Sequence, residues 1–237
     1  MAGNETNRLG MPLLQPAQAQ KHVTVNEALM RLDGLVGLVL QSISETAPPA
    51  VVTDGLCWAV PGGASGDWQG HGGQIAIGAN GGWVFQQPAP GQRAHVADRG
   101  VEAIHDGSRW VAGAITLGGS GAGLLAGLAE GEVVVSAGAS IVSGLQIPSH
   151  SLVIGATARV VEPLTGSLTG WQLGTPGAEN RFGQGLGKGA GSWARGMLGQ
   201  PMTYWQAENL VMTAEGGNFA AGRVRIAVHW LELRVPD

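Results

Sequence analysis

The sequence predicts a mainly β protein with one amphipathic helix near its N-terminus. The chain has 237 residues, of which 41 are glycine and 8 are tryptophan. This composition suits short strands joined by tight turns. Apolar residues recur at helical spacing in residues 24–40, whereas further along the chain they alternate with a period of two. We therefore expect an N-terminal arm and helix, a small β domain, a linker and a C-terminal β-sandwich of jelly-roll type.

Residues 1–23 are predicted to form an extended attachment arm. Pro12 and Pro16 disfavour helix in the residues before them. The uncharged centre of the arm, residues 11–19, has little to fold against nearby. We therefore expect the arm to dock on another protein of a larger assembly.

Residues 24–45 are predicted to form the amphipathic helix. Thr24 and Glu27 have the spacing of a capping box at its start. Its buried stripe consists of Ala28, Leu29, Leu32, Leu35, Val36, Val39 and Leu40. The opposite face holds Gly34 and Gly37, each costing about 1 kcal/mol relative to alanine in a helix interior. The two glycines indicate that another backbone approaches closely.

Two alternatives fit this helix. It covers one side of a β domain, or it packs on copies of itself. In the second case the chain is a homo-oligomer, with a trimer favoured and a pentamer possible. The residues expected at that helix interface are Leu29, Leu32, Gly34, Leu35, Val36, Gly37 and Val39.

Residues 46–116 are predicted to form a small Trp-rich β domain. Its strands are expected at residues 54–60, 73–78, 81–88, 94–100 and 101–111. The pattern Asp-Gly-x-x-Trp occurs twice, ending at Trp58 and at Trp110, and each copy predicts a turn followed by a strand. Together with Trp68 and Trp83, these tryptophans are expected to form most of the core.

Residues 117–131 are rich in Gly, Ser and Ala and are predicted to be a flexible linker. Residues 132–237 follow as the β-sandwich. Its strands are expected at residues 132–136, 151–162, 168–173, 210–214 and 223–235. The glycine-dense stretch 174–203 is expected to be a long irregular loop, and long loops on a β scaffold usually carry function.

The candidate binding site lies in and beside this stretch. Sugar binding uses aromatic faces against the ring and polar side chains for the hydroxyls. The residues of these types are Asn180, Arg181, Trp193, Tyr204 and Trp205. The alternative is that the aromatic side chains plug one end of the sandwich.

Several other functions are disfavoured. The formal charge is −4, and the closest approach to a basic cluster is Arg223 with Arg225, so no nucleic-acid partner is expected. Apolar runs are shorter than a membrane span, and the first ten residues do not resemble a signal peptide. The six histidines and the single Cys57 form no metal, cofactor or nucleophile motif. No catalytic pair of carboxylates is indicated by spacing.

Residues 11–33 resemble the start of a family defined by a domain of unknown function, found in alphaproteobacterial phages, prophages and gene transfer agents. Residues 62–76 and 81–91 are similar to its middle. Four C-terminal segments resemble cap domains that follow it in many such proteins, namely residues 147–160, 164–174, 180–187 and 211–233.

The resemblance implies a head spike or tail fibre of a phage-like particle that contacts other capsid or tail proteins. Its tip would bind the recipient cell's capsular polysaccharide without catalysis, and the particle would assemble in the cytoplasm and leave by lysis. The alternatives are a particle-borne polysaccharide-degrading enzyme and a spike or fibre base without a ligand.

Overall fold

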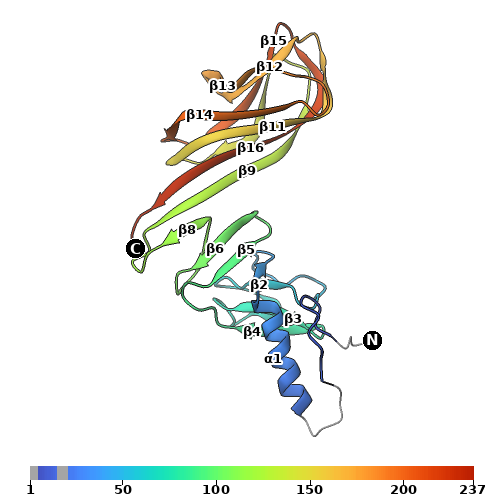
Figure 1. Ribbon diagram of the computed structural model, residues 1–237, viewed down its shortest axis with the longest axis vertical. Coiled ribbons are helices and arrows are strands. Elements are labelled where there is room, and N and C mark those ends of the chain that lie inside the picture. Colours follow the sequence, from blue (N-terminus) through green and yellow to red (C-terminus); the bar gives the residue numbers. More distant parts are fainter. Residues whose placement is uncertain (1–4, 15–20) are drawn as a thin grey trace. The chain divides into compact units, whose positions relative to one another are not determined.

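The computed structural model describes residues 5–14 and 21–237. It divides into two compact units, Met1–Gly123 with Val235–Asp237, and Leu124–Arg234. The described residues contain one α-helix near the N-terminus and many strands, so the mainly β prediction is confirmed (Figure 1).

The helix α1 spans Lys21–Leu35 and is therefore shorter than the predicted range 24–45. Val39–Leu40 form strand β1 instead. Gly37 has a φ of +56° in the turn after the helix, a left-handed conformation that commonly ends helices. The predicted capping box is wrong, because Thr24 lies inside the helix and Glu27 pairs with Arg31 at 2.7 Å.

The helix covers part of the sheet of its own unit, as in the first alternative, and it packs there through Leu35 of the predicted stripe and through the face that was expected to be exposed. Asp33 and Gly34 are buried, whereas Leu32 and Val36 are each 50% exposed. A Cβ added at Gly34 would lie 2.8 Å from Cγ2 of Ile77, so this glycine admits the side chain of a strand in the same chain. Gly37 has no neighbour within 4 Å of an added Cβ. Within the described residues, the atoms nearest to an added Cβ at Gly34 belong to side chains, so the expected backbone contact is absent there; approach of a second copy of the chain stays a prediction.

Part of the predicted arm is folded. Glu5 and Pro12 form an antiparallel bridge, and the amide of Thr6 donates to the carbonyl of Met11 at 2.9 Å. This turn is held against the C-terminal end of α1 by the buried carboxylate of Asp33. The expectation that the arm is extended and has no local partner is wrong for residues 5–14. Residues 15–20 lie outside the described part.

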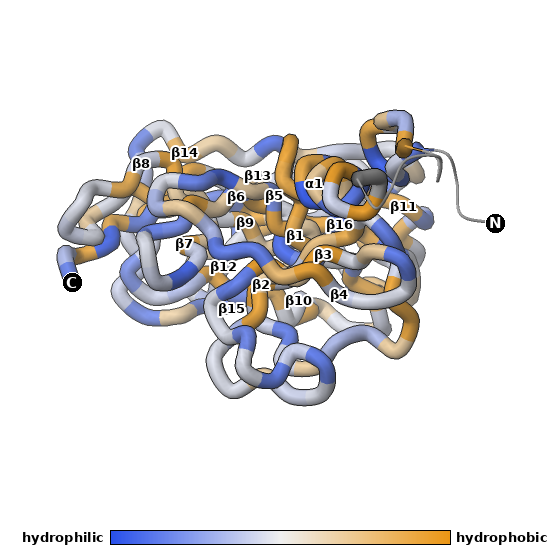
Figure 2. Tube along the Cα trace, turned by 90° about the horizontal axis from the view of Figure 1, so that it is seen from below, coloured by the Kyte–Doolittle hydropathy of each residue, from blue (hydrophilic) through white to orange (hydrophobic). Residues whose placement is uncertain are grey.

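The first unit contains a seven-stranded sheet in the order β4-β3-β2-β1-β5-β6-β7. Strands β1, β2 and β3 are hydrophobic along much of their length (Figure 2). Short β1 runs parallel to both neighbours, β2 and β5. The remaining elements of this unit are β2 (Cys57–Ala59), a 3-10 turn η1 (Gly66–Trp68), β3 (Ile75–Ala79), β4 (Gly82–Gln86), β5 (Arg93–Val96), β6 (Val101–His105), β7 (Trp110–Ala112) and β8 (Ala114–Leu117).

Three of the four expected core tryptophans share one cluster. Trp83 lies edge-on to both Trp58 and Trp68, with ring centroids 5.4 Å apart in each pair. Trp110 instead packs against a second cluster and lies 5.1 Å from the ring of His105. The unit therefore has two small cores, because the central sheet is covered by different residues on its two faces.

The second unit has the strand order of a jelly roll. One sheet is ordered β10-β15-β12-β13, and the other places β14, β11, β16 and β9 side by side. The first strand thus lies beside the last and the second beside the next to last, as in a jelly roll. The strands are β9 (Gly123–Val135), β10 (Ser140–Ile147), β11 (Ser151–Gly166), β12 (Gly170–Thr175), β13 (Ala178–Leu186), β14 (Trp193–Tyr204), β15 (Glu208–Glu215) and β16 (Phe219–Arg234).

Two predicted irregular segments are strands. Residues 123–131 of the expected linker belong to β9, and most of the expected loop 174–203 forms β13 and β14. Some of the glycines in that stretch are needed for close packing between strands. A Cβ added at Gly196 would overlap the carbonyl of Phe182 on the neighbouring strand. Strand β10 was not predicted.

Candidate functional site

The structure separates the residues predicted to form one binding site. Trp193 is the first residue of β14, and Trp205 directly follows its last. Trp193 and Tyr204 pair with Arg159 and Ser151 on β11, which are eight residues apart, so the two tryptophans lie about 25–30 Å apart along the sheet. They are 63% and 72% exposed, so each could contact a ligand, but they cannot share one sugar site.

The other predicted residues are not gathered around either tryptophan. Tyr204 is 7% exposed and belongs to the core, and burial raises the pKa of its phenol. The Arg181 guanidinium lies 2.7 Å from the sulfur of Met202, and Asn180 donates to Gln184 at 3.1 Å. These contacts occupy Arg181 and Asn180 locally.

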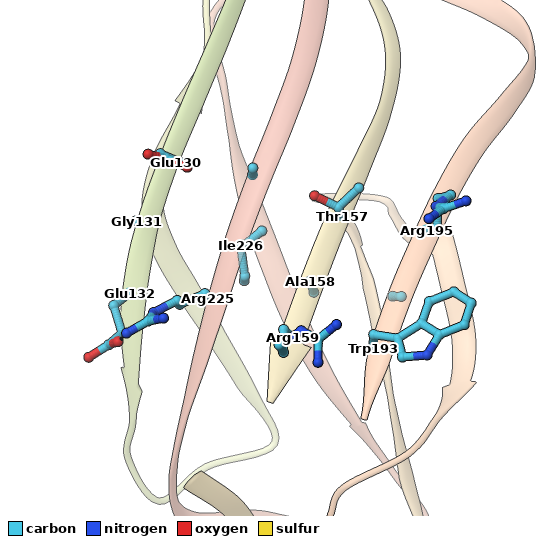
Figure 3. A pocket seen from close by; sticks show the side chains of 12 residues that line it. Glu130, Gly131, Glu132, Thr157, Ala158, Arg159, Trp193, Arg195, Arg225 and Ile226 are labelled. Atoms are coloured by element: carbon cyan, nitrogen blue, oxygen red, sulfur yellow. Dashed lines mark hydrogen bonds and ion pairs between the residues drawn. The ribbon is translucent and has the colours of Figure 1, made fainter. Parts of the chain in front are cut away.

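An open groove of about 850 Å³ crosses the outer face of the sheet that contains β9, β16, β11 and β14 (Figure 3). Trp193 and Arg195 project from β14, whereas Glu130 and Glu132 lie on β9 at the opposite side. The groove is lined by Glu130, Gly131, Glu132, Thr157, Ala158, Arg159, Trp193, Ala194, Arg195, Arg225, Ile226 and Ala227.

Strand register explains why this face is hollow. In one row Trp193 stands opposite Arg159, and Arg159 stands opposite Arg225. In the next row Arg195 stands opposite Thr157, and Thr157 stands opposite Ala227. Residues that point away from the core occur at every second position along a strand. In the second row Thr157 and Ala227 are short, whereas Arg159 and Arg225 beside them in the first row are long. The face is therefore hollow above Thr157 and Ala227.

The two sides of the groove differ in charge balance. Glu132 accepts from Arg223 at 2.9 Å and from Arg225 at 3.1 Å, and Arg223 also pairs with Glu162 at 3.0 Å. The hydrogen bond from Arg223 is the main reason why the pKa of Glu132 is lowered. On the β9 side, arginines and carboxylates thus neutralise one another.

On the β11 and β14 side, positive charge is left over. Among the described residues, no carboxylate lies within 4.0 Å of Arg159 or Arg195. The Arg195 guanidinium carbon lies 5.8 Å from the ring centroid of Trp193. A flat aromatic surface and two guanidinium groups therefore border the same hollow. Guanidinium forks match planar anions, and an indole face suits the apolar face of a sugar ring.

A smaller pocket, of about 390 Å³, lies in the first unit. It is lined in part by His105, Arg109 and Trp110. Burial lowers the pKa of His105, which keeps its ring neutral near pH 7, and its Nδ1 accepts from the amide of Gly107. Arg109 is already paired with Asp106 and Asp237. This pocket was not predicted from the sequence.

The groove could be predicted only in part from the sequence. Thr157 and Arg159, Trp193 and Arg195, and Arg223 and Arg225 are each two residues apart within a strand, so each pair shares one face. Spacing cannot indicate which pairs lie side by side, because that depends on the register between strands distant in the chain.

Within the described residues, no three His, Cys, Asp or Glu side chains are grouped as metal ligands. None of the described helices has the length and hydropathy to cross a membrane.

Residues 25–111 match a family model described as "Protein of unknown function (DUF2793)". This range covers most of α1 and the sheet of the first unit as far as β7. It supports the resemblance to a domain-of-unknown-function family in this part of the chain. No curated protein matches the sequence.

Among solved structures, a chain of the "Cyanophage Pam1 capsid asymmetric unit" is similar over 45% of this chain and 84% of that chain. The sequence identity is 16% and the TM-score is 0.35. A likeness of this size identifies no shared function.

Proposed function

We propose that this protein is a spike or fibre component of a phage-like particle that attaches to cells by binding a surface polysaccharide. The resemblance of residues 11–33 to proteins of phages and gene transfer agents supports the particle, and the DUF2793 match over residues 25–111 overlaps the end of this segment. In this proposal the particle assembles in the cytoplasm, leaves by lysis and holds the chain through other capsid or tail proteins.

The observation that carries polysaccharide binding is the groove with exposed Trp193 beside Arg159 and Arg195. One sugar ring would stack on the indole, while Thr157 and the guanidinium groups would bond to ring substituents. A single such stack contributes about 1 kcal/mol. One groove would therefore bind weakly, and several copies on one particle would supply avidity.

We propose binding without cleavage. A glycosidase needs a protonated carboxyl group whose pKa is raised, so that it can act as the general acid. Glu132, which lines the groove, has the opposite perturbation, because Arg223 and Arg225 stabilise its charged form. Release of reducing ends from capsular polysaccharide by the full chain would contradict this part of the proposal.

The experiment for binding compares the labelled full chain on capsulated and acapsular recipient cells. We expect binding only to capsulated cells, and we expect Trp193→Ala to reduce it at least about fivefold, corresponding to about 1 kcal/mol for each groove. Trp205→Ala is the matched control, since it removes an equally exposed tryptophan from the other end of β14. Equal binding to both cell types, or equal loss in both variants, would refute the groove as the site.

The proposal includes a homo-oligomer, with a trimer favoured and a pentamer possible. The supporting feature is an exposed apolar stripe formed by Val25 and Leu32 on α1 and by Val36 directly after it, whose amide donates to the carbonyl of Leu32. Gly34 and Gly37 no longer contribute to the argument, because each has an intrachain role.

Light scattering of the full chain and of the double variant Leu32→Glu with Val36→Glu tests this stripe. We expect the native mass to be a multiple of the chain mass and the variant to be monomeric. Val51→Glu is the control, because Val51 is equally apolar and more exposed but lies outside the helix. A native monomer at micromolar concentration would contradict self-association.

A further inference from the structure

We infer that the groove selects an acidic polysaccharide, with one sugar carboxylate held between Arg159 and Arg195. This inference rests on the proposed function and names its ligand class. It is carried by the placement of two uncompensated guanidinium groups beside an exposed indole.

The two arginines are positioned to reach one anion. Arg159 stands directly opposite Trp193, and Arg195 is two residues beyond Trp193 on the same face of β14. Such diagonal neighbours on adjacent strands lie about 7–8 Å apart. Both side chains are exposed, and each is long enough to turn toward the short Thr157, which stands opposite Arg195 and two residues before Arg159 on β11. A carboxylate above Thr157 could therefore accept from both guanidinium groups.

The charges around the groove determine where the carboxylate of a bound sugar would lie. Arg223 and Arg225 are already paired with Glu132, so that side of the groove offers no free cation pair. Glu130 adds a further negative charge on β9. A sugar carboxylate is repelled from β9 and attracted to β11 and β14. The neighbouring sugar would then lie against Trp193, which gives the bound chain one preferred direction across the sheet.

The same arrangement suits an anionic ligand. Arg159 and Arg195 carry like charges, and among the described residues no carboxylate lies within 4.0 Å of either. They flank one hollow, next to an indole that is 63% exposed and has the Arg195 guanidinium carbon 5.8 Å from its ring centroid. An anionic sugar would relieve the repulsion and bury part of the indole.

The test uses the full chain and an oligosaccharide of alternating hexuronate and N-acetylhexosamine. The matched ligand is the same oligosaccharide after carboxyl reduction, which removes the charge and keeps the rings. We expect the reduced form to bind at least about tenfold more weakly, corresponding to about 1.4 kcal/mol. Raising salt from about 50 mM to about 500 mM should weaken binding of the acidic form and leave the reduced form nearly unchanged.

Variants assign the effect to the two arginines. Arg159→Gln and Arg195→Gln should each abolish the preference for the acidic form, and Arg159→Lys should restore part of it, since lysine keeps the charge but not the fork. Arg181→Gln is the control, because Arg181 lies on β13 in the other sheet.

The outcomes separate this inference from the proposed function. Equal affinity for the two oligosaccharides, no binding of the acidic one, or a preference that survives both Gln variants overturns the acidic ligand class. The proposed function would stand in those cases if binding to capsulated cells still depended on Trp193. Loss of that dependence refutes the proposed function itself.

Discussion

Replacing Asp33 should release the N-terminal turn from the helix. Its side chain is 1% exposed and accepts three hydrogen bonds, from the Thr6 hydroxyl at 2.7 Å, the Arg8 amide at 3.0 Å and the Leu9 amide at 2.7 Å. The Arg8 guanidinium in turn donates to the carbonyls of Asp33, Gly34 and Gly37 at the end of α1. The Asp33 carboxylate thus holds the N-terminal turn in place, and the Arg8 side chain of that turn binds the end of α1.

The magnitude follows from these bonds. An unsatisfied buried donor costs about 1–3 kcal/mol, so three would cost several kcal/mol if the turn stayed in place. The turn can instead detach from the helix and expose its donors to water, which limits the loss of stability. We therefore expect Asp33→Ala to destabilise the first unit by about 2–4 kcal/mol. Asp33→Asn keeps one oxygen but presents an N–H group to another donor. We therefore expect it to destabilise the first unit by about 1–2 kcal/mol.

Hydrogen exchange followed by peptide is the suitable assay, because it reports the two units separately. Peptides that cover Thr6 to Met11 should lose protection in Asp33→Ala, and those of α1 should lose part of it. Asp98→Ala is the control, since Asp98 is exposed. Unchanged protection of the Leu9 amide, with stability within about 0.5 kcal/mol of the native chain, would refute the reasoning.

Two further predictions concern closely packed positions. Gly127→Ala should lower the stability of the second unit by about 1–3 kcal/mol in thermal unfolding, because the added Cβ would overlap the Trp230 ring. Gly199→Ala should be nearly neutral, since nothing lies within 4 Å of its added Cβ, and equal effects would contradict the packing explanation. Burial raises the pKa of Cys57 from 9.0 to about 12, so the folded thiol should resist alkylation at about pH 8. Its contribution to stability should be complete below pH 9.0 and be lost as the pH rises toward about 12, because the unfolded thiol ionises first; rapid alkylation of the native chain would contradict this.

The sequence alone determined the fold class and many of the elements. Alternating apolar residues in residues 151–162 follow from the two faces of a strand, and β11 lies there. The turn before Trp58 was predictable because Gly55 can take its positive φ of +82° at little cost. Composition failed for residues 174–203, since glycine suits both irregular loops and tightly packed sheet corners.

The tertiary structure alone decided the contacts between distant residues. Asp33 resembled an exposed helix residue, because its partners Thr6, Arg8 and Leu9 lie more than twenty residues earlier in the chain. The groove likewise depends on strand register, which sets Arg159 beside both Trp193 and Arg225. Local sequence fixes which face of a strand a side chain occupies. The neighbours on that face are set by how the strands pair, and pairing minimises the free energy of the whole sheet rather than that of any one segment.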